Sequence, residues 1–359
     1  MTDSAHEQAG RRAAPETTVL PAIPNREDRG QRHSPGGKAK VSAAVRTRRV
    51  IELKPDFGSQ CLYYLMFGVL HLLSLLPDFV LYPFGVLGGL VGYWLDRRHV
   101  KIGLKNLELA FPEYSADKRR QILRASYVNL GRGAAEYIRL GGFFYRRLKC
   151  RVSYERFELW DEIARRHPGK GFLILTAHFG NFELLGAAHA LHGHQISLVH
   201  HTQRFLAGDA FICAIRQRVG VETIRKHAAA RAVLKALRAN QLVGIPFDQN
   251  AKRSEAVFVP FLGDLAATSS GLARLVQISG AAVVPVFIVR QPDNRTHRIV
   301  IQDEIPIQRS SDPSADIEEN TRRFVKPIEE IARRYPEQFL WTHRRFRTRP
   351  RGAPKIYDS

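Results

Sequence analysis

The sequence predicts an α/β protein with a central, largely parallel, twisted sheet flanked by helices, and two observations indicate this fold class. Short aliphatic and β-branched runs alternate with helical patterns, so crossovers should place the strands parallel. The polar motif residues follow directly after strands, at the edge where such sheets form clefts. Strands are expected at residues 171–177, 195–199, 242–247, 257–259, 282–289 and 298–301. Helices are expected at residues 116–140, 182–191, 209–219, 228–239, 269–278 and 318–334.

Four regions of different composition follow one another along the chain. Residues 1–54 are rich in Arg, Ala, Pro, Gly and Ser, which predicts a disordered basic tail. Residues 55–98 form a hydrophobic segment that is expected to associate with a membrane. Residues 99–346 hold the α/β domain, and residues 347–359 form a basic C-terminal tail.

The hydrophobic segment contains two apolar runs, residues 61–76 and 79–95, which Pro77 and Asp78 separate. Each run is slightly shorter than the roughly 20 residues that a spanning helix needs. Basic residues precede the first run and follow the second, which favours a monotopic or re-entrant helix pair with both ends cytoplasmic. A single tilted span and a buried helix pair of a soluble core are the alternatives.

The charge of the chain narrows the classes of partner. Lys and Arg exceed Asp and Glu by 21, which indicates an anionic partner. The basic residues are spread along the chain and accompany no helix-turn-helix, RNP or zinc-finger pattern, so a membrane surface is expected and nucleic acid is not. The three cysteines are far apart, which fits a reducing compartment without a disulfide framework.

One motif joins several chemical requirements within a few residues. His178 directly follows the strand expected at residues 171–177, and four residues separate it from Glu183. A neutral imidazole can accept a proton from a hydroxyl near pH 7, and a carboxylate can fix its tautomer. Gly180 and Asn181 allow a tight turn before the next helix, whose first N–H groups can stabilise a developing negative charge. The motif predicts a catalytic base, His178, with Glu183 as its orienting partner.

Other catalytic arrangements are less well supported. No Ser or Cys stands in a nucleophile-elbow context, which favours direct transfer without a covalent enzyme intermediate. Five histidines crowd between residues 189 and 201, but no carboxylate joins them in a His-Glu-x-x-His arrangement, so no metal and no other cofactor is expected.

The motif also resembles a known family. The string Thr-Ala-His-Phe-Gly-Asn-Phe-Glu at residues 176–183 is similar to the first block of the lipid A late acyltransferases, the lauroyl and myristoyl transferases within the lysophospholipid-type acyltransferase class. Four further blocks follow in the family's order, at residues 214–222, 242–250, 257–263 and 336–346, the last containing Trp-Thr-His-Arg-Arg. The resemblance covers about residues 62 to 346.

The resemblance implies a substrate pair and further site residues. It implies acyl carrier protein or acyl-CoA as the donor, and a phosphorylated, acylated glucosamine disaccharide as the lipid acceptor. It places the enzyme at the inner membrane with its site on the cytoplasmic side. Asn181, Arg216 and Asp248 match family positions and are expected to bind substrate, with Arg216 holding a phosphate. From the residues alone, Arg216 equally fits a surface pair with Glu222, and Asp248 fits a turn or helix cap.

One departure from the family leaves alternatives open. The family often carries an Arg and an Asn shortly after the second strand, where this chain reads Val-His-His-Thr-Gln-Arg at residues 199–204. A same-class acyltransferase acting on a phosphoinositide mannoside, an ornithine lipid or a lysophospholipid is therefore an alternative. A basic membrane scaffold without catalysis is another, although the intact His178 and Glu183 pair argues against it.

Overall fold

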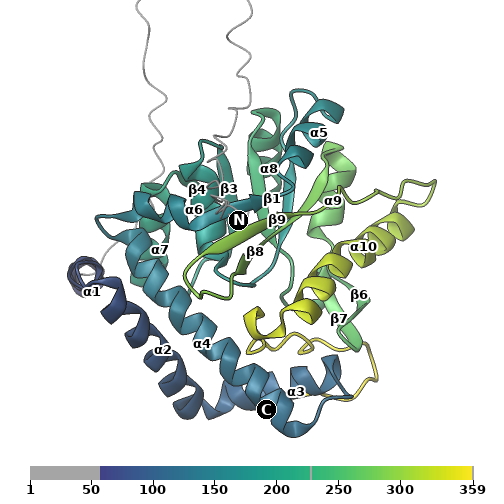
Figure 1. The fold of residues 1–359 in the computed structure, drawn as a ribbon. Coiled ribbons are helices and arrows are strands. Elements are labelled where there is room, and N and C mark those ends of the chain that lie inside the picture. Colours follow the sequence, from purple (N-terminus) through teal and green to yellow (C-terminus); the bar gives the residue numbers. More distant parts are fainter. Residues whose placement is uncertain (1–56, 227–228, 358–359) are drawn as a thin grey trace, which may run out of the picture. The chain divides into compact units, whose positions relative to one another are not determined.

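A computed structural model describes residues 57–226 and 229–357 (Figure 1). The tail predicted at residues 1–54 lies outside the described residues. The main sheet has seven strands in the order β1-β9-β8-β2-β5-β3-β4. Their bounds are β1 Val152–Glu155, β2 Leu173–Thr176, β3 Ile196–His200, β4 Val221–Arg225, β5 Leu242–Pro246, β8 Val283–Arg290 and β9 His297–Ile301.

The pairing of the strands confirms the predicted fold class. β8, β2, β5, β3 and β4 run parallel to one another. β9 returns antiparallel to β8 through a hairpin, and β1 pairs parallel with β9 at the sheet edge. The strand expected at residues 257–259 is found as β6 (Ala256–Phe261), but it pairs with β7 (Asp264–Ser269) in a separate two-stranded hairpin.

Helices cover both faces of the main sheet (Figure 1). Because successive side chains of a strand point to opposite faces, Leu173 and Leu175 of β2 belong to one core and Ile174 to the other. The Ile174 face is covered by α5 (Glu158–Arg166), α6 (Phe182–Leu191) and α7 (Leu206–Arg218). The Leu173 face is covered by α8 (Ala229–Arg238), α9 (Gly271–Ser279) and α10 (Pro313–Arg334). Short 3-10 turns are η2 (Tyr145–Arg151), η3 (Arg253–Glu255) and η4 (Pro336–Gln338).

Four further helices precede the sheet in the described part of the chain: α1 (Phe57–Ser74), α2 (Asp78–Leu95), α3 (Arg97–Ala110) and α4 (Ala116–Gly141). α2 packs along α4 at very close range (Figure 1). A Cβ atom added to Gly131 of α4 would lie 2.0 Å from the carbonyl oxygen of Gly85 of α2. Only glycine permits this approach of the two backbones.

Ion pairs hold the turn between the two apolar runs in place. The Asp78 carboxylate at the start of α2 pairs with Arg139 of α4 at 2.7 Å and also with Arg151. The two runs form separate helices, α1 and α2, on either side of the Pro77-Asp78 interruption. Their expected association with a membrane stays a prediction.

The outward sides of α1 and α2 carry large exposed apolar side chains. On α2 these include Phe84, Leu87, Val91 and Trp94, which recur at helical spacing on one face. By length and composition α2 is the one helix among the described residues that could cross a membrane, and 17% of that segment is buried.

Candidate active site

The strand–turn–helix around His178 has the form that the sequence predicts. His178 follows β2, whose four residues are all buried. Gly180 adopts a φ of +58°, and a Cβ atom there would lie 2.0 Å from the carbonyl oxygen of Ile288. Only glycine fits this position. Asn181 caps α6, because its side-chain oxygen accepts a hydrogen bond from the N–H of Leu184 at 3.1 Å.

The hydrogen-bond partner of the His178 ring is Asp248. The His178 Nδ1 lies 2.9 Å from Oδ1 of Asp248, and the backbone N–H of His178 donates to the same oxygen at 3.1 Å. Asp248 follows β5, the direct neighbour of β2, so the ends of these parallel strands bring the two residues together. Because a carboxylate only accepts, Nδ1 carries the donated hydrogen and Nε2 carries a lone pair. The side-chain amide nitrogen of Gln249 lies 3.3 Å from Nε2 and can donate a hydrogen bond to that lone pair.

The environment of this pair sets its protonation. The Asp248 side chain is 2% exposed and that of His178 is 20% exposed. Burial is the largest single influence and disfavours the imidazolium. The charge and hydrogen bond of Asp248, together with the charge of Glu183, outweigh burial and raise the pKa of His178 above its ordinary 6.5. Burial alone would raise the pKa of Asp248, whereas the charge and hydrogen bonds of His178 lower it. His178 is therefore a strengthened base next to an ionised carboxylate.

Glu183 has a different partner from the one predicted. Its carboxylate forms a two-pronged ion pair with Arg216 of α7, at 2.9 Å from Nε and 2.6 Å from Nη2. The guanidinium fork matches both carboxylate oxygens, which a single imidazole N–H cannot do. Glu183 still acts on His178 through its charge, which contributes to the raised pKa of that histidine. The tautomer of His178 is thus fixed by Asp248. Arg216 forms a nearly buried pair with Glu183 in place of the surface pair with Glu222 that the residues alone allowed.

Two buried polar groups around this ion pair have no hydrogen-bond partner among the residues that the structure describes. They are Nη1 of Arg216 and the hydroxyl of Tyr137 on α4. Burial and the charge of Glu183 raise the pKa of Tyr137, so its hydroxyl stays protonated. Buried polar groups are normally hydrogen-bonded, so these two groups mark a position for a water or substrate oxygen.

Polar groups of the turn at Gly180 and Asn181 form hydrogen bonds to other parts of the protein. The Gly180 N–H donates to the carbonyl oxygen of Gln338 at 2.8 Å. The Asn181 Nδ2 donates to Oε2 of Glu136 at 2.7 Å, and Asn181 is buried. Both polar atoms of the Asn181 side chain form hydrogen bonds within the protein, and the expected contact with substrate stays a prediction. The N–H groups of Phe182 and Glu183 remain without intrahelical acceptors in the first turn of α6.

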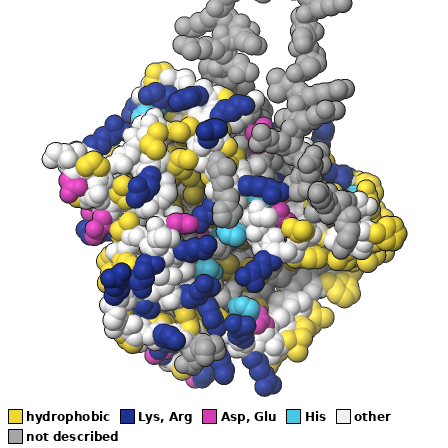
Figure 2. Space-filling view, turned by 180° about the vertical axis from the view of Figure 1, so that it is seen from behind, with side chains coloured by type: hydrophobic (Ala, Val, Ile, Leu, Met, Phe, Trp, Pro, Cys, Tyr) yellow, Lys and Arg dark blue, Asp and Glu magenta, His cyan; other side chains and the backbone are white. Residues whose placement is uncertain are grey.

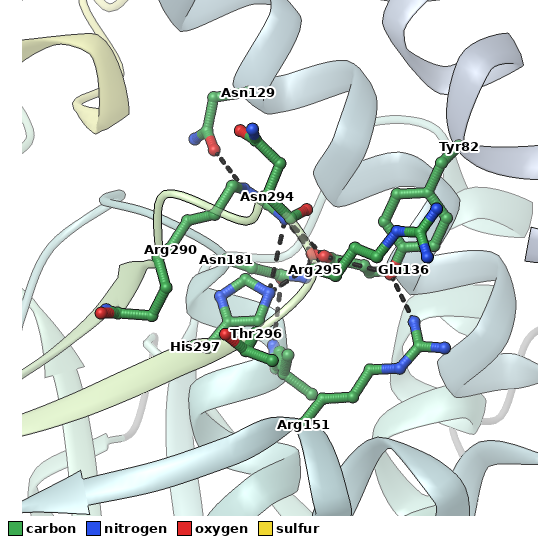
Figure 3. Close-up of polar contacts among 12 residues, drawn as sticks. Tyr82, Asn129, Glu136, Arg151, Asn181, Arg290, Asn294, Arg295, Thr296 and His297 are labelled. Carbon is green, nitrogen blue, oxygen red and sulfur yellow. Dashed lines mark hydrogen bonds and ion pairs between the residues drawn. The ribbon is translucent and has the colours of Figure 1, made fainter. Parts of the chain in front are cut away.

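Glu136 is the centre of a buried polar network (Figure 3). Arg290 of β8 reaches both carboxylate oxygens, with Nη2 at 2.8 Å from Oε2, and His297 Nε2 lies 2.9 Å from Oε1. Burial would raise the pKa of Glu136, but His297 and Arg290 lower it to about 2. The Arg290 Nε also donates to Asn129 at 2.8 Å. This network connects α4 and the β8–β9 hairpin to the turn that follows His178.

The crowded histidines do not gather around one point. His189 is buried beside the Tyr154 hydroxyl, and burial with the charges of two neighbouring histidines lowers its pKa to about 3. His200 lies 2.8 Å from Asp209 and 3.9 Å from Sγ of Cys213, and these three residues are near enough to hold an ion. Asp209 also accepts from the backbone N–H of Gln203. The contacts describe a cluster that secures the loop after β3, and the expectation of no metal stays a prediction.

Comparison with known proteins decides the family. Residues 54–348 match the family described as Bacterial lipid A biosynthesis acyltransferase. The chain belongs to this family. The resemblance stated from the sequence blocks is confirmed, and the protein is an acyltransferase.

Three relatives of the acyltransferase come from Escherichia coli (strain K12). The chain is 30% identical to a lipid A biosynthesis lauroyltransferase, over 84% of this chain and 99% of the relative. It is 29% identical to a lipid A biosynthesis palmitoleoyltransferase, over 81% of this chain and 92% of the relative. It is 25% identical to a lipid A biosynthesis myristoyltransferase, over 78% and 84% respectively.

The sequence did not predict two features of the acyltransferase site. It assigned Asp248 to substrate, although its place after a strand neighbouring β2 was a usable signal for contact with His178. It gave no role to Glu136, Arg290 or His297. A glutamate inside a long amphipathic helix carries no local sign that a buried arginine and histidine from a distant hairpin will meet it.

Proposed function

We propose that this acyltransferase moves a fatty acyl chain from an acyl thioester, carried by acyl carrier protein or CoA, to a hydroxyl group of a lipid A precursor. The observation that carries the proposal is the His178–Asp248 pair, which leaves Nε2 of a histidine as a base, in a chain whose relatives are lipid A acyltransferases. The proposed place of the reaction is the cytoplasmic side of the inner membrane.

The proposed reaction is a direct transfer. Nε2 of His178 takes the proton of the acceptor hydroxyl as the oxygen attacks the thioester carbonyl. The tetrahedral intermediate collapses by breaking the C–S bond, and the departing thiolate receives the proton from the imidazolium. Asp248 keeps Nδ1 protonated and stabilises the imidazolium throughout. A thioester is already activated, so the enzyme needs a base and an oxyanion site rather than a covalent nucleophile.

The oxyanion site is assigned to the start of α6 and to Arg216. The first-turn N–H groups of Phe182 and Glu183 stand at the positive end of the helix dipole, next to His178 in the chain. The unpartnered Nη1 of Arg216 supplies a further donor. In this assignment Glu183 holds Arg216 in place and raises the basicity of His178 through its charge.

Membrane association is proposed from the surface of the first two helices. α1 and α2 pack on the domain with one side and expose large apolar residues on the other, which fits helices lying in one leaflet. In Figure 2, apolar side chains gather at the side of α1 and α2, whereas many Lys and Arg side chains cover the rest of that face. Such a basic surface attracts anionic lipid headgroups and an acidic carrier protein.

The test is acyl transfer by the detergent-solubilised protein. Labelled acyl groups on acyl carrier protein and on CoA are offered separately with a tetra-acylated lipid A precursor, and mass spectrometry identifies the product. The expected result is a penta-acylated product from at least one donor. Transfer to a different lipid in a parallel assay with total membrane lipid, and none to the precursor, would replace the proposed acceptor. Transfer to neither would contradict the proposed function.

A further inference from the structure

A cavity of about 700 Å³ lies between α4, α2 and the β8–β9 hairpin, outside the residues assigned to the reaction. This volume is within the range that small-molecule headgroups occupy. One wall is a face of α4 that carries Gln121, Arg124 and Arg132, and the opposite wall is the hairpin with Asn294. Figure 3 shows Asn129, Arg290 and Asn294, three of the lining residues.

The cavity adjoins the turn that follows His178. Gln338 lines the cavity, and its carbonyl oxygen accepts the hydrogen bond from Gly180. Its side chain is also bonded to the backbone of Arg290 in both directions, at 2.8 and 3.1 Å. A ligand in the cavity would therefore contact the same residue, Gln338, that bonds the turn after His178.

The lining carries an excess of positive charge. Four arginines line it, of which Arg290 is neutralised by Glu136 and Arg298 by Glu155 at 3.1 Å. Within residues 57–226 and 229–357, no ion pair is found for the other two, Arg124 and Arg132. The one acid in the lining is Glu337.

Arg132 is the more informative of the two free arginines because it is half-buried. Burial and the charge of Arg290 lower its pKa, and Glu136 offsets this only in part. Desolvating a guanidinium without an acid partner is costly. An anion in the cavity would remove that cost, and a guanidinium fork suits the oxygens of a phosphate.

The cavity also opens toward an apolar surface. Leu90 of α2 lines it, and the exposed Leu87, Val91 and Trp94 lie on the same side of that helix. A ligand with an anionic head and apolar chains would place the head between Arg124 and Arg132 and its chains along α2. Side-chain amides from Gln121, Asn129 and Asn294 offer hydrogen bonds to the hydroxyls of a sugar or glycerol.

We propose that this cavity binds the phosphate-bearing headgroup of the lipid acceptor, with Arg124 and Arg132 as the phosphate ligands. The identity of that lipid as the acceptor rests on the proposed function, whereas the binding of a lipid phosphate does not. Phosphate is the oxyanion that membrane lipids carry, and the apolar neighbourhood of the cavity distinguishes a lipid from a soluble phosphate ester.

The experiment compares two variants on the same helix. Arg132→Gln removes a cavity charge, and Arg120→Gln removes an exposed α4 arginine that pairs with Asp117 and does not line the cavity. Acylation is measured with the phosphorylated precursor and with the same lipid after its phosphates are removed. We expect Arg132→Gln to raise KM for the phosphorylated acceptor about tenfold or more, the size of a lost charge-assisted hydrogen bond, with kcat little changed. Arg120→Gln should leave both constants unchanged.

Three results would overturn the proposal. An equal rise in KM with the dephosphorylated acceptor would make Arg132 a structural residue. A rise in KM for the acyl donor alone would assign the cavity to the carrier. Equal weakening of binding to phosphatidylglycerol vesicles and to acceptor-containing vesicles would assign it to bulk phospholipid.

A binding measurement separates this proposal from the proposed function. Labelled phosphorylated precursor in neutral detergent micelles is titrated with wild type, Arg132→Gln and Arg120→Gln, with inorganic phosphate as competitor. Weaker binding by Arg132→Gln alone supports the cavity assignment even if no acyl transfer is observed. Equal binding by all three proteins, or complete displacement by inorganic phosphate at concentrations near that of the lipid, would overturn it.

Discussion

His178 and Asp248, 70 positions apart in the chain, meet with Nδ1 of the imidazole 2.9 Å from Oδ1 of the carboxylate. They follow β2 and β5, two adjacent parallel strands, so the sheet itself sets their separation. The same oxygen of Asp248 also accepts the backbone N–H of His178, which holds the carboxylate in line with the ring. The orientation of the His178 ring therefore depends on main-chain geometry as well as on the side chain.

Asp248→Asn should lower kcat by about a hundredfold or more. The amide no longer fixes the productive tautomer or stabilises the imidazolium, and comparable substitutions beside a catalytic histidine cost up to about 10⁴. Acyl transfer is measured under saturating donor and acceptor. The control is Asp303→Asn, an exposed acid that pairs with Arg156 at the surface and should keep full activity. Wild-type activity in Asp248→Asn would remove Asp248 from the site.

The pH dependence of kcat/KM should follow the raised pKa of His178. The base form is lost as the pH falls through the pKa of the free enzyme, so activity should rise with pH and level off above an inflection that lies above 6.5. In the residual activity of Asp248→Asn the inflection should move to lower pH, because the Asp248 charge no longer raises the pKa of His178. An inflection below 6.5 in the wild type would contradict the raised pKa that Asp248 and Glu183 together give to His178.

Glu136→Gln should lower the free energy of unfolding by about 3–5 kcal/mol, because it leaves the buried Arg290 without its counter-charge. Denaturant unfolding in detergent, followed by tryptophan fluorescence, measures the change. Glu108→Gln, which breaks an exposed pair with Lys105, is the control and should have little effect. Equal effects of the two substitutions would contradict a stabilising role of the network.

The same carboxylate should make stability fall in acid. The folded-state pKa of Glu136 is lowered from 4.5 to about 2, so its contribution is fully present above about pH 4.5 and is lost as the pH falls toward 2. Glu136→Gln should lack this part of the decrease in the free energy of unfolding at low pH. Unfolding of both proteins at a series of pH values, from 6 down to the lowest that the detergent system allows, measures the difference.

Membrane binding should depend on the outward face of α2. The double substitution Leu87→Ser with Trp94→Ser removes side chains that are 54% and 69% exposed, so it should weaken membrane partitioning by about tenfold or more without changing the free energy of unfolding. Sedimentation with vesicles measures the partitioning. Ile278→Ser, at an equally exposed apolar position on α9, is the matched control. Equal sedimentation of all three proteins would contradict the membrane-facing assignment of α2.

Much of the fold could be predicted because, in many segments, the spacing of the hydrophobic residues and the length of the segment indicate the same element. The helix expected at residues 182–191 is α6 with the same bounds, and the strands expected near β2, β5 and β8 are present. β4 was missed because Glu222, Thr223 and Arg225 give this edge strand a polar pattern. The separate β6–β7 hairpin was missed because the strand expected at residues 257–259 was taken as part of the main sheet and no strand was expected at β7. Which strands pair is decided by long-range packing.

The candidate site was predictable only in its local part. The turn from β2 into α6 places His178, Gly180 and Asn181 as the sequence indicates. The partner of His178 depends on which strand lies beside β2, and the partner of Glu183 depends on how α7 packs on α6. Tertiary contacts that no single segment encodes decide both partners. Glu183 pairs with Arg216 rather than with His178 because the guanidinium binds both carboxylate oxygens.

The role of His178 as the base is tested most directly by the single-turnover rate of His178→Ala with labelled acyl carrier protein and the tetra-acylated precursor, measured beside wild type and His192→Ala. His192 bonds the carbonyl oxygen of Ala188 on the same helix as Glu183 and is the matched control. We expect His178→Ala to lose activity by about a hundredfold or more, which is within the range for a general base. His192→Ala should transfer at the wild-type rate. Transfer by His178→Ala at the wild-type rate would show that His178 is not the base.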